Sequence, residues 1–147
     1  MRRKDKEVST LEQIEEIIKE AKVCRLGLYE KDKDYPYIVP LNFGYSDKKL
    51  YFHSAKVGKK VEILKSNPRV CFEIDIALGL VKEESPCDWG NKFKSIIGFG
   101  TVSFLEDPVQ KSDAMNILML NYSNDKHIFP EKALANTLVC VVDIEEM

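Results

Sequence analysis

The chain has 147 residues, the length of one ordinary domain, and its 44% hydrophobic and 31% charged residues are typical of a folded globular protein rather than a disordered one. A net charge of -2 gives no electrostatic reason to expect a nucleic acid or a membrane as partner, and no apolar run approaches the ~20 residues needed to cross a bilayer. We therefore expect a single domain over residues 1–147, located in the cytoplasm.

Cysteine and histidine are too sparse and too scattered to indicate a metal site. The four cysteines and two histidines show none of the close spacings of metal ligands. Singly placed cysteines in a cytoplasmic protein are expected to remain reduced thiols. We expect no bound metal ion.

The N-terminal third predicts a helix followed by two strands. Thr10 and Gln13 form a capping-box pattern ahead of isoleucines at helical spacing, which predicts a helix at about residues 10–22. Alternating apolar residues predict strands at 24–29 and 37–45. Pro40 removes a ladder donor from the second strand, which indicates an edge or a bulge with backbone open to another group. An edge protected against aggregation is an equally good explanation.

The stretch from residue 50 to 75 predicts a strand, a basic turn, a helix and a second strand. The first strand ends in His53 and Ser54, and the turn contains Gly58, Lys59 and Lys60. Free amides, a hydroxyl, an imidazole and two ammonium groups at one helix start are suited to an anion such as phosphate. The alternative is a solvated lysine pair, although two cations there oppose the helix dipole by roughly 0.3–1 kcal/mol unless an anion offsets them.

The second half of the chain alternates strands and helices. We predict a surface loop at 83–86, a long strand at 93–104, a helix at 109–122, a short helix or turn after Pro130, and a final strand at 137–144. Gly98 and Gly100 in the long strand indicate a bulge or the close approach of another group. About six mostly antiparallel strands with helices between them predict an α+β barrel or a strongly curved sheet.

Several motifs follow one another in an informative order: YPYIVPLNFGY (35–45), LYFHSA (50–55), GKK (58–60), NPRVCF (67–72) and CDW (87–89). In this order the chain resembles the pyridoxamine 5'-phosphate oxidase-like flavoproteins, and within them the Nim-type nitroimidazole-resistance subgroup. The resemblance extends from the first helix to the last strand. It implies an α+β fold with a mostly antiparallel six-stranded split β-barrel and flanking helices.

The resemblance also implies a homodimer that binds flavin mononucleotide (FMN), or FAD as the alternative, in two clefts at the subunit interface. The flavin ring would lie along the strand at 39–43, the phosphate near the basic turn, and a third group of residues would come from the partner subunit. His53 would in addition contact the substrate, which makes it the candidate catalytic residue. The implied cofactor-binding residues are Val39, Pro40, Leu41, Asn42, Phe43, His53, Ser54, Lys59 and Lys60, with Trp89, Ser95 and Ile96 from the partner.

We therefore expect an FMN-dependent oxidoreductase that reduces a small acceptor, such as a nitroaromatic, with electrons from a nicotinamide donor. One alternative is a flavin- or haem-binding module without turnover, and another is a structural dimer whose ligand site has decayed. Vitamin B6 oxidation is not expected, because Ile38 stands where the oxidase has an arginine, and the oxidase's longer C-terminal extension has no counterpart before Met147.

Overall fold

The computed structural model describes residues 5, 7–8, 10–31 and 33–147. Its strands are β1 (Cys24–Leu28), β2 (Tyr37–Leu41), β3 (Gly44–Ser46), β4 (Lys49–Ala55), β5 (Arg69–Val81), β6 (Gly90–Leu105) and β7 (Thr137–Glu146). Its helices are α1 (Leu11–Glu20), α2 (Lys59–Ser66), the short 3-10 helix η2 (Pro86–Asp88), α3 (Pro108–Leu120) and α4 (Glu131–Asn136). No helix formed by these residues is long and apolar enough to span a membrane.

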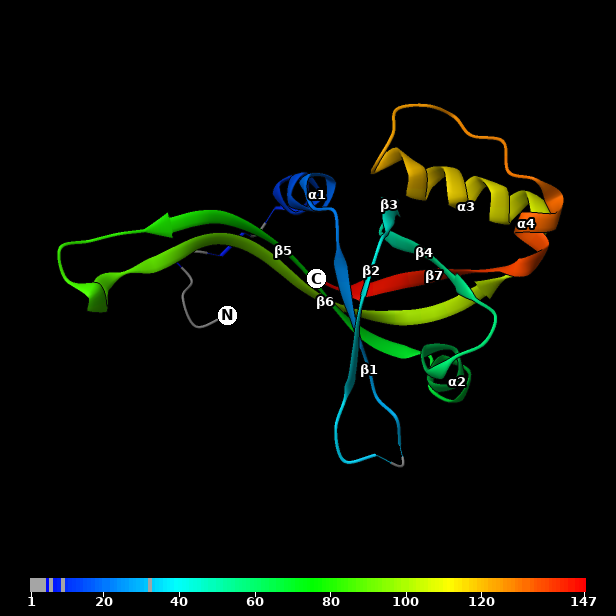
Figure 1. Ribbon diagram of the computed structural model, residues 1–147, viewed down its shortest axis with the longest axis horizontal. Helices are drawn as coiled ribbons and strands as arrows, with labels where there is room; N and C mark the ends of the chain where they lie inside the picture. Colours follow the sequence, from blue (N-terminus) through cyan, green and yellow to red (C-terminus); the bar gives the residue numbers. More distant parts are fainter. Residues whose placement is uncertain (1–4, 6, 9, 32) are drawn as a thin grey trace.

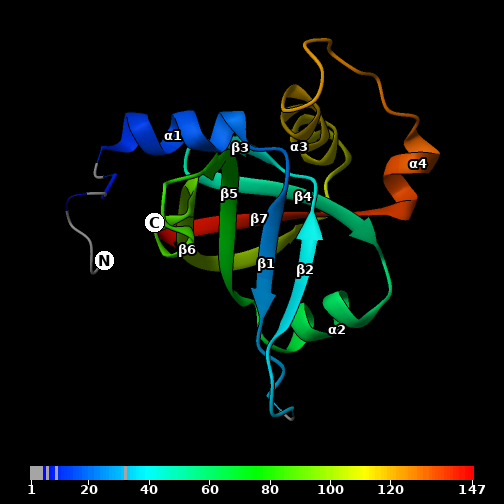
Figure 2. The same cartoon turned by 60° about the vertical axis from the view of Figure 1, so that its left-hand side comes forward.

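The strands form one antiparallel sheet in the order β2-β1-β5-β6-β7-β4-β3, and the sheet curves strongly (Figures 1 and 2). The predicted α+β fold with a mostly antiparallel sheet is confirmed. The sheet has seven strands, however, because residues 37–45 form β2 and β3 rather than one strand. It is also not closed, since β2 and β3 are its two edges. No strand pairing joins β2 to β3 or β4. We call this open boundary between β2 and the β3–β4 end of the sheet the seam.

The C-terminal end of α3 explains why the chain breaks between β2 and β3. The amide of Phe43 donates to the Tyr122 hydroxyl at 2.9 Å, and that hydroxyl donates to the carbonyl of Lys22 at 2.8 Å. The side-chain amide of Asn121 donates to the carbonyls of Phe43 and Ala21, both at 3.1 Å. The backbone of Phe43 is therefore satisfied by α3, and it does not need a neighbouring strand.

Inward-facing apolar side chains of the curved sheet form the core, against which α1 packs through Ile17 and Ile18. The predicted start of α1 is confirmed, because the Thr10 hydroxyl accepts from the amide of Gln13 at 3.4 Å. Helices α3 and α4 pack against β3, β4 and β7 (Figure 2). The largest fully buried side chains include Phe43, Phe72, Ile18, Leu26, Leu50, Leu64 and Ile74.

Two glycines of β6, Gly98 and Gly100, occupy crowded positions. A β carbon on Gly98 would overlap the ring of Phe72, and one on Gly100 would overlap the carbonyl of Asp143. The β6–β7 register also shifts between Phe99 and Gly100. The predicted close approach is confirmed, whereas the residue left unpaired by the register shift is Glu145 of β7, opposite the glycines.

The β5–β6 hairpin is longer than the sequence pattern predicted. Its outer end, residues 77–93, projects beyond the rest of the molecule, and we call this segment the arm (Figure 1). Leu78, Leu80, Trp89 and Phe93 are exposed there. Because both faces of the arm meet solvent, it lacks the in-and-out alternation by which a strand is recognised in a sequence.

Replacing Tyr122 with Phe should lower the free energy of unfolding by about 1–3 kcal/mol, because the partly buried amide of Phe43 would lose its acceptor. Denaturant unfolding followed by circular dichroism measures this change. Tyr35→Phe is the matched control, since that side chain is 67% exposed. A loss for Tyr122→Phe no larger than for the control would contradict this account of the break.

Candidate functional site

The seam leaves backbone groups of β2 unpaired. β2 is an edge strand whose one neighbour is β1. Pro40 has no N–H, so it fits a position whose backbone points away from β1, and Ile38 shares this orientation because antiparallel pairs alternate. The carbonyls of both residues and the amide of Ile38 therefore face the open edge. They are available to a ligand lying along β2.

Helix α2 begins across the end of this seam with its first amides free. Gly58 precedes the helix with φ 124°, a conformation that favours glycine, and it offers no capping side chain. Its carbonyl accepts from the amides of Val61 and Glu62 at 2.9 and 3.1 Å. The amides of Lys59 and Lys60 have no acceptor within the described residues, which leaves two donors beside the positive end of the helix dipole.

The two lysines of the first turn lie toward different strands. The Lys59 ammonium is 4.9 Å from the ring centre of Tyr37 in β2, and the Lys60 ammonium is 5.6 Å from that of Phe52 in β4. Lys59 also forms an ion pair with Glu30 at 3.4 Å. Among the described residues no carboxylate pairs with Lys60. The helix start thus bridges the seam and presents one cation without a counter-charge.

Burial and charge shift the ionisation of the groups on the β4 side. Partial burial lowers the pKa of Lys60 below its ordinary value. The pKa of His53 is also lowered, first by desolvation and then by the positive charge of Lys60. His53 is therefore neutral at pH 7, and its imidazole can donate one hydrogen bond and accept another. The Ser54 hydroxyl, next in β4, forms no hydrogen bond with any described residue.

The structure brings most of the predicted site residues to the seam, but in different environments. Pro40 and Asn42 are exposed, whereas Val39 and Leu41 are half-buried against the core. Phe43 is 1% exposed, and its amide already donates to Tyr122. Its side chain and N–H are therefore engaged within the protein, and the exposed neighbours are better placed to contact a ligand.

The residues predicted to come from a partner subunit lie away from the seam of their own chain. Trp89 is 45% exposed in the arm, where its indole N–H donates to the carbonyl of Glu83 at 2.9 Å. Ser95 is exposed on β6, and Ile96 is buried in the core. One chain does not unite these residues with β2 and α2. Their contribution to a second copy remains a prediction.

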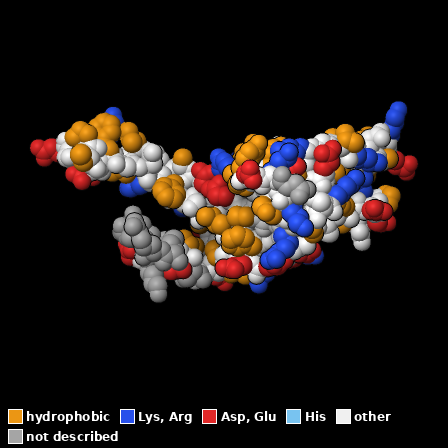
Figure 3. Space-filling view, turned by 90° about the horizontal axis from the view of Figure 1, so that it is seen from below, with side chains coloured by type: hydrophobic (Ala, Val, Ile, Leu, Met, Phe, Trp, Pro, Cys, Tyr) orange, Lys and Arg blue, Asp and Glu red, His pale blue; other side chains and the backbone are white. Residues whose placement is uncertain are grey.

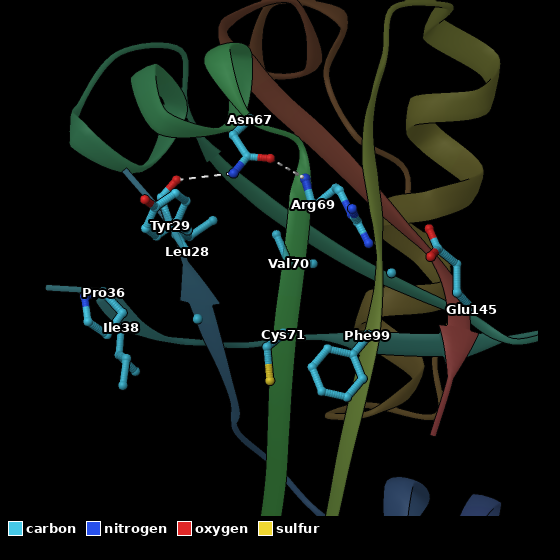
Figure 4. A pocket seen from close by; sticks show the side chains of 12 residues that line it. Leu28, Tyr29, Pro36, Ile38, Asn67, Arg69, Val70, Cys71, Phe99 and Glu145 are labelled. Carbon is cyan, nitrogen blue, oxygen red and sulfur yellow. Dashed lines mark hydrogen bonds between the residues drawn. The ribbon is translucent and has the colours of Figure 1, made fainter. Parts of the chain in front are cut away.

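A cavity of about 510 Å³ lies elsewhere, on the outer face of the sheet (Figure 4). Ile38, Cys71 and Phe99 line it from neighbouring strands, and Arg69 and Glu145 stand at one side (Figure 4). No residue of the predicted site contributes to it. Sequence analysis missed this face because its apolar residues alternate with charged ones, as on an ordinary solvated strand.

Sequence analysis also missed Glu30, because the charged residues around it give no indication of a role in the site. It lies in the run EKDKD, which has the composition of a polar turn. In the structure Glu30 lies in the β1–β2 connection, and its carboxylate pairs with the ammonium of Lys59 in α2. Only the fold brings these two residues together.

The two buried thiols are not poised for redox chemistry. Burial raises the pKa of Cys24 and of Cys140 to about 12, so both remain protonated at neutral pH. Within the described residues, no group of three His, Cys, Asp or Glu side chains could hold a metal ion.

Comparison with known proteins gives one family and several related structures. A family model described as pyridoxamine 5'-phosphate oxidase matches residues 10–147. A candidate 5-nitroimidazole antibiotic resistance protein from Bacteroides thetaiotaomicron is similar with a TM-score of 0.82 and 33% identity, over 94% of this chain and 81% of that chain. No curated protein matched the chain in a sequence comparison.

Two further solved structures extend the comparison. A FAD-binding protein from Mesorhizobium loti is similar with a TM-score of 0.64 and 25% identity, over 92% of this chain and 90% of that chain. A FAD- and haem-binding protein from Mycobacterium smegmatis has a TM-score of 0.76 at 17% identity, over 93% of this chain and 67% of that chain. At that lower identity the likeness shows a shared fold.

The pKa of His53 should lie below its ordinary value of 6.5, and it should rise part of the way back in Lys60→Met, which removes the neighbouring charge. Histidine ring signals followed by NMR against pH measure this. His127→Gln identifies the signal, because the chain has two histidines. A His53 pKa at or above 6.5, or one unaffected by Lys60→Met, would show that the imidazole does not sense the helix start.

Proposed function

Because the chain belongs to the pyridoxamine 5'-phosphate oxidase family, we propose that it is an oxidoreductase that binds FMN along the seam and uses it to reduce a small acceptor. The observation that carries this proposal is the start of α2. There, two amides and the half-buried ammonium of Lys60, which have no partner among the described residues, lie at the end of an open strand edge. A half-buried cation without a counter-ion is costly unless a ligand supplies the negative charge.

The phosphate of FMN is suited to this end of the seam. A phosphate monoester is largely dianionic at neutral pH, and it would accept from the amides of Lys59 and Lys60 and from the hydroxyl of Ser54. The helix dipole and the Lys60 ammonium would add electrostatic attraction. A phosphate beside Lys60 would also favour the charged amine, which offsets the lowering of its pKa by burial.

The flavin ring would extend from the phosphate along β2. Its polar edge needs hydrogen-bond donors and acceptors, which the free backbone groups of Ile38 and Pro40 and the exposed side chain of Asn42 can supply. Val39 and Leu41 hold this strand against the core, so the edge is fixed before a ligand arrives. The neighbouring FAD-binding protein from Mesorhizobium loti supports a flavin in this fold.

The bound flavin would supply electron and hydride transfer, while the chain's own residues would bind and orient it. His53 lies on β4 beside Lys60, with a neutral imidazole at pH 7. We propose that His53 contacts the substrate, because its ring N–H can donate a hydrogen bond to a substrate oxygen atom. A nitroaromatic would present such oxygens, and the name of the Bacteroides neighbour supports this class. A nicotinamide nucleotide is the proposed electron donor.

The active form in this proposal is a homodimer whose subunits join through the outer face of the sheet. Ile38, Ile97 and Phe99 on that face are 62%, 59% and 47% exposed, and Ile38 and Phe99 line the cavity. Hydrophobic side chains also gather along the arm (Figure 3). Apolar surface of this kind is commonly covered by a partner. The arm of one copy would then carry Trp89, and the outer face of its β6 would carry Ser95, toward the seam of the other. Ile96 would contribute through its backbone alone, because its side chain is buried in its own core.

Replacing Lys59 and Lys60 together with Ala should weaken FMN binding by roughly tenfold or more, because charge-assisted hydrogen bonds to the phosphate would be lost. Flavin absorbance per chain after purification and titration with added FMN measure this. Lys126→Ala with Lys132→Ala removes the same charge from exposed positions near α4. Equal flavin content in both double variants would contradict the proposed phosphate position.

The same preparation distinguishes an enzyme from a binding module. A nicotinamide donor should bleach the blue flavin absorbance, and a nitroaromatic should restore it. Bleaching by neither NADH nor NADPH would favour the flavin- or haem-binding module without turnover. Mass analysis of the released cofactor separates FMN from FAD.

Phe99→Asp should convert the dimer to a monomer and reduce flavin content, because a carboxylate would be buried in the apolar centre of the interface. Sedimentation velocity measures the assembly, and circular dichroism checks that the monomer remains folded. Ile128→Asp is the control, since Ile128 is 98% exposed in the loop between α3 and α4, away from this face. A flavin-bearing Phe99→Asp dimer would exclude the outer face as the interface.

A further inference from the structure

We propose that Glu30 holds Lys59 away from the phosphate position, so that Lys60 alone supplies the ammonium contact and Glu30 sets the affinity for the cofactor. This inference rests on the proposed function, and it deepens it by assigning different roles to two adjacent lysines. It also gives a role to a residue of the β1–β2 connection. The contacts of Glu30, Lys59 and Lys60 carry it.

Among the described residues, Lys59 supplies the positive charge that pairs with the Glu30 carboxylate. Its Oε2 atom is buried and accepts no hydrogen bond from any described residue. The Lys59 ammonium lies 3.4 Å from that oxygen and 4.9 Å from the ring centre of Tyr37. A carboxylate oxygen shielded from water is unfavourable without a cation nearby. The pair therefore keeps the Lys59 side chain over the β1–β2 side of the helix.

Lys60 is in the opposite situation. Its ammonium contacts the ring of Phe52 and lies near His53, and no described carboxylate neutralises it. Both lysines belong to the same turn of α2, yet one has its counter-charge within the protein and the other does not. An incoming dianion is therefore expected to contact Lys60 directly. Lys59 could move to the dianion only by leaving Glu30 unpaired.

Glu30 has opposite effects on the empty and the occupied site. In the empty site it offsets one of two positive charges that oppose the helix dipole. In the occupied site its negative charge repels the phosphate and retains Lys59. Replacing Glu30 with Gln removes the repulsion and frees Lys59, so the affinity for a phosphate-bearing ligand should rise.

The test compares FMN, riboflavin and inorganic phosphate as ligands of the intact protein by fluorescence and NMR titration. Glu30→Gln should tighten FMN and phosphate by roughly two- to fivefold, the range expected for one partly exposed charge. Riboflavin, which lacks the phosphate, should bind unchanged. In Glu30→Gln with Lys59→Met the FMN affinity should fall back to about the starting value, because the freed cation is gone.

Glu62→Gln is the matched control, since it removes an acidic charge from the same first turn of α2 but leaves the Glu30–Lys59 pair intact. If FMN affinity rose equally in Glu62→Gln and Glu30→Gln, the effect would come from net charge alone, and the proposal would be overturned. Weaker FMN binding in Glu30→Gln would also overturn it, because Glu30 would then position Lys59 for the phosphate. If the starting protein bound neither FMN nor riboflavin, the proposed function would fail, and the phosphate titration would still decide the role of Glu30.

Discussion

The site depends on the way the sheet is prevented from closing. An unpaired strand edge normally seeks another strand, and β2 and β3 are joined by only Asn42 and Phe43. Tyr122 and Asn121 satisfy the backbone of Phe43 from the end of α3, so the chain changes direction there and no ladder forms between β2 and β4. The open edge of β2 is thus a consequence of this local arrangement, whereas the uncapped start of α2 follows from Gly58, which has no side chain to cap the helix.

The charges of the molecule have unequal importance because they differ in exposure. Arg25 bridges Glu73 and Asp75 on the outer face, but these side chains are partly exposed, and such pairs contribute about 0–1 kcal/mol in a single chain. Lys60 is half-buried with no counter-ion among the described residues, so an anion bound beside it would change its electrostatic environment. In the proposed function, a few shielded groups rather than the net charge would govern binding at the seam.

Local features of the fold could be predicted, and features that join distant segments could not. The cap at Thr10 and the crowded positions of Gly98 and Gly100 in β6 follow from neighbouring residues or from strand composition. The division of residues 37–45 could not be foreseen, because it is imposed by Tyr122, far along the chain. Likewise, the lysine pair was visible in the sequence, but its unequal roles depend on Glu30. The partner contribution of Trp89 remains a prediction, since one chain cannot show it.

The most direct test of the central claim is a crystal structure of the protein reconstituted with FMN. The account predicts a phosphate at the start of α2, within hydrogen-bond distance of the Lys59 and Lys60 amides and the Lys60 ammonium, with the flavin ring along β2. A flavin bound in the outer-face cavity beside Cys71 and Phe99, with the start of α2 in contact with solvent alone, would contradict it.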